Sequence, residues 1–101
     1  MSKEFTDFKS FYPYYLKEHS DINCRRLHFA GTSLVFGIVL LSIWQANPWW
    51  LLLVPVAGYG FAWTGHFFFE HNKPATFEYP FYSLAGDFVM YKDILTGKVK
   101  I

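Results

Sequence analysis

Four histidines and one glutamate have the residue types and spacing to bind a metal ion. His66 and Glu70 lie four residues apart, so on a helix their side chains project from one face, one turn from each other. His71 lies five residues from His66, about 140° further round, so we do not expect both to reach one ion. His19 and His28 precede the apolar run that ends beside His66. Imidazole nitrogens with a carboxylate oxygen suit Fe(II) or Zn(II).

A long uncharged segment separates these histidines. No Asp, Glu, Lys or Arg occurs from Phe29 to Phe69, and roughly forty residues are enough for two bilayer spans of about 20 residues each. Asn47-Pro48 divides the segment, because Asn favours turns and Pro starts helices well. We therefore predict spans over about 29–46 and 48–67. A soluble alternative would have to bury both helices, and 101 residues offer too little interior for that.

A hairpin of two spans would bring distant histidines together. It places His28, at the start of one helix, beside His66, at the end of the other, and His19 can fold over them from the preceding segment. Three neutral imidazoles, with Glu70 as an optional carboxylate, predict a site for Fe(II) or Zn(II). Ionisable groups beside a membrane-spanning segment are costly unless they are partnered, which favours a functional role.

Polar residues near the histidines are candidates for supporting roles. Asn23 and Asp87 could bind the second ring nitrogen of a ligating histidine; the alternatives are a surface amide for Asn23 and an exposed charge for Asp87. Arg25 and Arg26 are placed to meet lipid phosphates or a substrate carboxylate.

The flanking segments predict two further helices. The aromatic residues near the N-terminus recur at helical spacing, and Ser20 or Asp21 could cap a helix that begins near Ile22. Residues 81–95 form a second amphipathic pattern, and Gly97 is a suitable stop. We therefore predict an all-α fold over residues 1–101, a single membrane-embedded domain in which amphipathic N- and C-terminal helices flank the hairpin.

Charge and cysteine content exclude several classes of protein. The net charge is +1, and there is no basic patch to indicate a nucleic-acid partner. A single cysteine, Cys24, rules out an intramolecular disulfide and a cysteine-cluster zinc site.

The cations near the hairpin lie at its open end, and its turn has none. The positive-inside rule therefore predicts that both termini and all four histidines are cytoplasmic. These cations are Lys17, Arg25, Arg26 and Lys73.

Several short motifs occur together along the chain. They are His19, Asn23 and His28, then Gly31-Thr32, Gly65-His66, Glu70, Lys73-Pro74-Ala75, Tyr79-Pro80 and Gly86-Asp87. In this order, from about Tyr12 to Gly97, they resemble the family of the fungal endoplasmic-reticulum 2-hydroxy fatty acid dioxygenase, which is common in bacteria as short proteins.

The resemblance implies an Fe(II)-dependent, membrane-embedded enzyme of fatty-acid α-oxidation. Such an enzyme uses O2 to shorten a 2-hydroxy long-chain fatty acid by one carbon. His19, His28 and His66 match the family's histidines, and Glu70 matches its following acid. The residues expected to neutralise the substrate carboxylate are Arg25, Arg26 and Lys73.

Two other functions remain open at this level. Two histidines on neighbouring helices are also how b-type haems are held, and a small membrane scaffold could carry the histidines as structural residues. Small residues at Gly31, Gly37, Gly58 and Gly60 would let helices approach closely and permit a homo-oligomer without requiring one.

Overall fold

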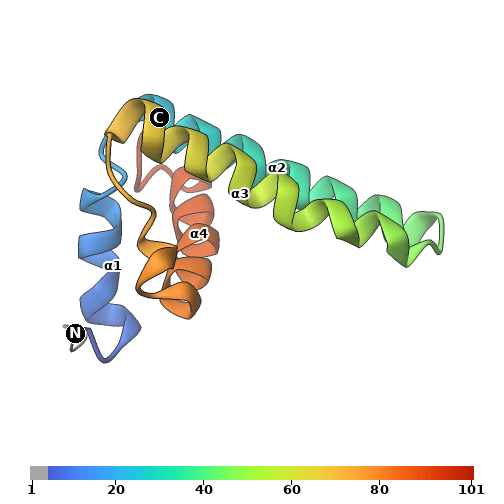
Figure 1. The fold of residues 1–101 in the computed structure, drawn as a ribbon, viewed down its shortest axis with the longest axis horizontal. Helices are drawn as coiled ribbons and strands as arrows, with labels where there is room; N and C mark the ends of the chain where they lie inside the picture. Colours follow the sequence, from blue (N-terminus) through green and yellow to red (C-terminus); the bar gives the residue numbers. More distant parts are fainter. Residues whose placement is uncertain (1–4) are drawn as a thin grey trace.

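Helices make up all the regular secondary structure in the computed structural model, which describes residues 5–101. The expected all-α fold is confirmed, with two long helices flanked by shorter ones (Figure 1). In chain order the elements are α1 (Phe8–Lys17), α2 (Ile22–Trp44), η1 (Pro48–Leu52), α3 (Leu53–Gly65), η2 (His66–Glu70), η3 (Ala75–Phe77) and α4 (Pro80–Leu95).

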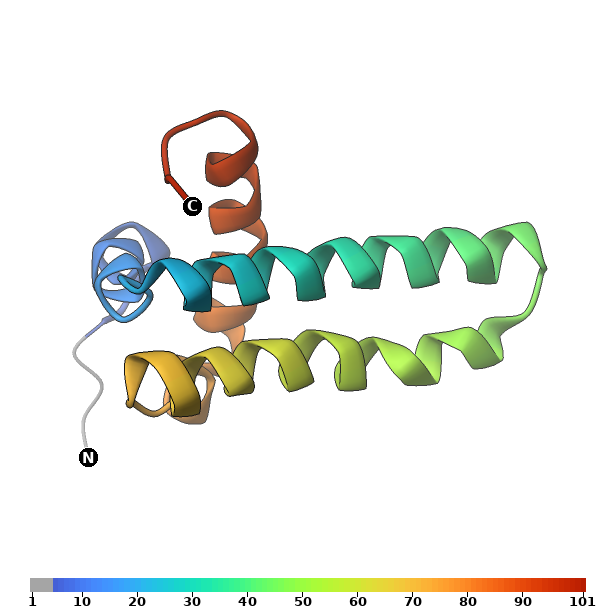
Figure 2. The same cartoon turned by 90° about the horizontal axis from the view of Figure 1, so that it is seen from above.

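The long helix α2 and the continuous helical run of η1, α3 and η2 form an antiparallel hairpin (Figure 2). Its turn lies at Asn47-Pro48, as predicted. Ala46 adopts a left-handed conformation (φ 50°), and the Asn47 side chain accepts a hydrogen bond from the Trp49 backbone N–H at 3.1 Å. The hydroxyl of Ser42 donates to the Asn47 carbonyl at 2.9 Å. The turn therefore satisfies its own polar groups and reverses the chain within a few residues.

The start of α2 follows the capping rule. Asp21 is the N-cap, and its carboxylate accepts hydrogen bonds from the N–H groups of Asn23 (2.8 Å) and Cys24 (3.2 Å). The predicted start near Ile22 is confirmed, with Asp21 rather than Ser20 as the cap. His28 consequently lies in the second turn of a continuous helix.

Two helical runs of 23 residues each, Ile22–Trp44 and Pro48–Glu70, are long and apolar enough to cross a membrane by length and composition. Near the hairpin turn their apolar side chains are exposed: Leu40 by 66%, Ile43 by 71% and Trp44 by 81%. A continuous apolar surface of this kind is typical of a segment surrounded by lipid.

Helices α1 and α4 lie at the open end of the hairpin, steeply inclined to it (Figure 1). The hydroxyl of Tyr12 in α1 donates to Asp93 in α4 at 2.7 Å. On the other side of α4, Tyr91 stacks on Phe29 of α2 with ring centroids 4.7 Å apart, and its hydroxyl lies 2.9 Å from the Ser33 hydroxyl. These contacts fix α4 between α1 and the hairpin.

An aromatic core forms beneath the open end. Its buried residues are Phe11, Tyr15, Ala75, Tyr79, Met90 and Val99. A Cβ added at Gly86 of α4 would lie only 2.8 Å from Cδ2 of the fully buried Tyr15. Close packing of α4 on the Tyr15 ring thus requires glycine at this position.

We predict that Gly86→Ala lowers the free energy of unfolding by about 1–3 kcal/mol, because the extra methyl would overpack the fully buried Tyr15 ring. Gly60→Ala is the matched control, since a Cβ at Gly60 meets nothing within 4 Å. Denaturant titration of both variants in detergent measures the difference, and equal stability of the two would contradict the tight contact.

Candidate metal centre

Three imidazoles from distant parts of the chain meet at the open end of the hairpin. His19 lies in the connection between α1 and α2, His28 on α2, and His66 at the end of α3. The Nε2 atom of His19 lies 3.0 Å from Nε2 of His28 and 2.9 Å from Nε2 of His66. All three side chains are buried. Among residues 5–101, this is the one group of histidines, cysteines and carboxylates whose ligand atoms converge as a metal requires.

The second nitrogen of each ring contacts an oxygen acceptor. These acceptors are the Tyr15 carbonyl for His19 (2.6 Å), the Cys24 carbonyl for His28 (2.9 Å) and the Asn72 side-chain oxygen for His66 (2.7 Å). A carbonyl oxygen can only accept, so the proton of each neutral ring resides on Nδ1. Each Nε2 therefore presents a lone pair to the other two.

Three lone pairs that face one another at hydrogen-bond distance repel unless a cation lies among them. The arrangement thus fits a metal ion, with the outer nitrogens held as ligating histidines usually are. Burial, and then the neighbouring imidazoles His28 and His66, hold the pKa of His19 well below its usual value, so this ring is neutral and ready to bind metal at neutral pH. Three protein ligands leave open coordination positions, as catalytic sites require.

A π-turn brings Asn72 to His66. The segment His66–Glu70 is π-helical, and the N–H groups of His71 and Asn72 both point to the His66 carbonyl, the latter at 3.1 Å. His71 is left-handed (φ 58°), which turns the chain back beneath His66. The Asn72 amide nitrogen donates to the Glu18 carbonyl at 3.1 Å, so its oxygen is the atom that faces His66. Such π-turns are frequent at functional sites.

The structure does not bring Glu70 to the imidazoles. Its carboxylate accepts a hydrogen bond from the Asp21 backbone N–H at 2.6 Å and a longer one from the Ser20 hydroxyl at 3.4 Å. Glu70 thus ties the end of the second long helical run to the start of α2. His71 is exposed and lies outside the cluster.

The two residues expected to support the ligands lie elsewhere. Asn23 is exposed and contacts no imidazole through its side chain. Asp87 accepts a hydrogen bond from the Tyr15 hydroxyl, and the Tyr15 ring stacks on His19 with centroids 4.0 Å apart. Burial raises the pKa of Asp87 to about 6, against the lowering effect of the Tyr15 hydrogen bond. Asp87 therefore reaches the cluster through Tyr15 rather than through a ring nitrogen.

The cations expected to meet a carboxylate occupy different positions. Arg25 donates to the His19 carbonyl at 2.6 Å and to the Lys100 carbonyl at 3.1 Å, which fixes the connection that carries His19. Arg26 and Lys73 are exposed. Lys73 precedes Pro74, which lines the small space, about 10 Å³, beside the imidazoles.

A family model described as 2-hydroxy-palmitic acid dioxygenase Mpo1-like matches residues 5–99. The chain belongs to this family. The resemblance drawn from the motifs is therefore confirmed, and the family's description implies dioxygenase activity. No curated protein and no solved structure matches the chain.

Sequence reasoning missed two residues of this Mpo1-like site. Asn72 lies six residues after His66, a spacing that an α-helix does not bring together, and an amide just before Lys73-Pro74 was the only available signal. Tyr15 belongs to the aromatic residues near the N-terminus whose spacing predicts a helix, but that pattern does not reveal the contacts of its carbonyl and hydroxyl groups.

We predict that Asn72→Ala weakens metal binding about 10- to 100-fold, because His66 loses the acceptor that orients its ring. Asn72→Asp keeps an acceptor oxygen and should restore most of the affinity. Chelator competition with Fe(II) or Zn(II) measures both. If Asn72→Asp lowers the metal affinity as much as Asn72→Ala does, the effect comes from the lost hydrogen bond to the Glu18 carbonyl instead.

For Glu70→Gln we predict unchanged metal content and a free energy of unfolding lower by about 1 kcal/mol, because a charged hydrogen bond to the Asp21 N–H becomes a neutral one. Elemental analysis and denaturant titration on one preparation check the two parts. Loss of metal in this variant would restore Glu70 as a ligand.

Proposed function

We propose that this protein is a non-haem Fe(II) dioxygenase that shortens a 2-hydroxy long-chain fatty acid by one carbon. The observation that carries the proposal is the convergence of three buried imidazole Nε2 atoms in a member of this family. The reaction balances as RCH(OH)COOH + O2 → RCOOH + CO2 + H2O. With O2 as the oxidant, no further reductant is required.

His19, His28 and His66 would hold the iron through Nε2. Bound Fe(II) would supply the activation of O2 and a Lewis acid for the substrate's oxygens. The protein's own part is orientation. The Tyr15 and Cys24 carbonyls hold two of the rings through Nδ1, and all three imidazoles are buried from solvent.

The exposed cations at this end suit the substrate's head group. Lys73 is exposed and directly precedes Pro74, which lines the space next to the imidazoles, so we propose that Lys73 attracts the incoming carboxylate. Arg26 is one turn from the start of α2 and exposed, and it would serve the same purpose or bind lipid phosphate. Arg25, which is committed to backbone carbonyls, is assigned to positioning His19.

We further propose that the hairpin is integral to the membrane. The turn at Asn47-Pro48 is uncharged, whereas Arg25, Arg26 and Lys73 lie at the open end. The positive-inside rule then places the imidazoles and both termini on the cytoplasmic side. A fatty acid in the cytoplasmic leaflet would present its carboxyl group at the depth of the imidazoles.

The b-type haem alternative is less well supported. A porphyrin between two histidines needs a flat space between their Nε2 atoms, but here these atoms are 2.9–3.0 Å apart. The space beside them is only about 10 Å³.

The test is metal content and turnover in one detergent preparation. We expect iron at about one per chain and conversion of 2-hydroxypalmitate to the acid one carbon shorter. Mass spectrometry detects the product. His66→Ala should weaken metal binding by more than about a hundredfold, since losing a ligand costs more than losing its hydrogen-bond partner. An iron-free, inactive wild-type protein after reconstitution with Fe(II) would overturn the proposal and favour the membrane scaffold.

A further inference from the structure

A second cavity, of about 210 Å³, lies between α2, α3 and α4. Along α2 its wall runs from His28 to Val35, seven residues or about 10 Å. Along the antiparallel α3 it runs from Ala62 to Val54, so both walls begin at the imidazole end and extend toward the hairpin turn. Leu84 and Phe88 of α4 close the third side.

The cavity has one polar end and apolar walls. His28 and Asp87 lie on its lining, and both also line the small space at the imidazoles, together with Tyr59 and Ala62. Valine, leucine and phenylalanine side chains dominate the remainder. A ligand with a polar head at the cluster and a hydrocarbon tail would match this distribution.

We propose that this cavity binds the acyl chain of the substrate, and that the side chains around Gly58 determine which chains are accepted. This inference rests on the proposed function, since it places the tail of the same 2-hydroxy acid. The head group lies at the imidazoles, and the first methylenes run along α2 and α3 toward Val35 and Val54. The rest of a long chain emerges into the bilayer.

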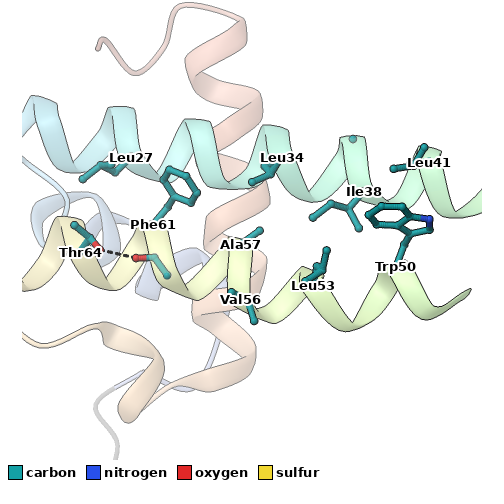
Figure 3. Close-up of a pocket in the computed structure, with 12 residues that line it drawn as sticks. Leu27, Leu34, Ile38, Leu41, Trp50, Leu53, Val56, Ala57, Phe61 and Thr64 are labelled. Carbon is teal, nitrogen blue, oxygen red and sulfur yellow. Dashed lines mark hydrogen bonds between the residues drawn. The ribbon is translucent and has the colours of Figure 1, made fainter.

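A larger groove on the hairpin is the competing location (Figure 3). It measures about 640 Å³ and includes Leu34, Ile38, Trp50 and Leu53 among its lining residues. None of its lining residues also lines the space at the imidazoles, and it contains no histidine or carboxylate. A chain bound there would have no head-group partner, so this groove fits lipid contact instead.

Two glycines on α3 distinguish the two locations. Gly58 lines the cavity, and a Cβ there would lie 3.6 Å from Cγ2 of Val35, an ordinary contact directed into the cavity. Gly60 lines the larger groove, and a Cβ there would meet nothing within 4 Å. Leucine at each position makes the same change to the helix, but only Gly58→Leu fills the cavity.

The experiment compares kcat/KM for 2-hydroxypalmitate and for 2-hydroxybutyrate, whose tail is too short to reach Gly58. Gly58→Leu should lower kcat/KM for the long acid by about tenfold or more. The kcat/KM for the short acid and the iron content should stay unchanged. Gly60→Leu should behave as wild type with both acids. Equal loss with both acids, or a chain-length effect in Gly60→Leu alone, would overturn the cavity assignment while leaving the reaction intact.

A binding measurement makes the inference independent of turnover. A 2-hydroxy fatty acid with a photoreactive diazirine in its middle should label α4 at Leu84 or Phe88, because α4 lines the cavity and not the larger groove. Excess 2-hydroxypalmitate should suppress the labelling. Labelling confined to α2 and α3, or no labelling at all, would overturn the assignment of the acyl chain to this cavity. Labelling of α4 without turnover of any acid would support this cavity as the binding site of the acyl chain and overturn the proposed reaction.

Discussion

The mutual approach of three imidazole lone pairs is the constraint on which this structure depends. His19, His28 and His66 are buried with their Nε2 atoms about 3 Å apart, an arrangement that is unfavourable without a cation. It is maintained because every Nδ1–H is already committed to an acceptor, two of them backbone carbonyls. These hydrogen bonds direct the three Nε2 atoms toward one point, which reduces the reorganisation that metal binding requires.

Much of the open end of the hairpin contributes to holding those donors. Tyr15 stacks on His19 and is packed against Gly86 of α4, so the aromatic core determines the position of the first ring. Arg25 fixes the backbone of the same connection. Glu70 bonds the start of α2 to the end of the second helical run, and the two arms of the hairpin are thereby joined at its open end. The aromatic packing and the polar contacts thus serve one geometry.

The hairpin gives this site an environment that suits an amphiphilic substrate. The hairpin surface is apolar, the cations lie at its open end, and the walls of the cavity between α2, α3 and α4 extend from the imidazole end toward the turn. The Asp87 carboxyl lies where the cavity meets the cluster and is held by Tyr15. Under the proposed function, one short chain would position a metal at the three histidines and a hydrocarbon tail between α2, α3 and α4.

The sequence alone determined the hairpin, its turn at Asn47-Pro48, a helix cap at Ser20 or Asp21 and the meeting of three histidines. These features follow from local capping chemistry, from the length of an uncharged run and from the fact that a hairpin brings its two ends together. Only the tertiary structure decided that Glu70 bonds to Asp21 and that Asn72 orients His66. The physical reason is the π-turn and the left-handed residue that follows it. The α-helical repeat no longer holds there, so spacing along the chain does not report which side chains meet.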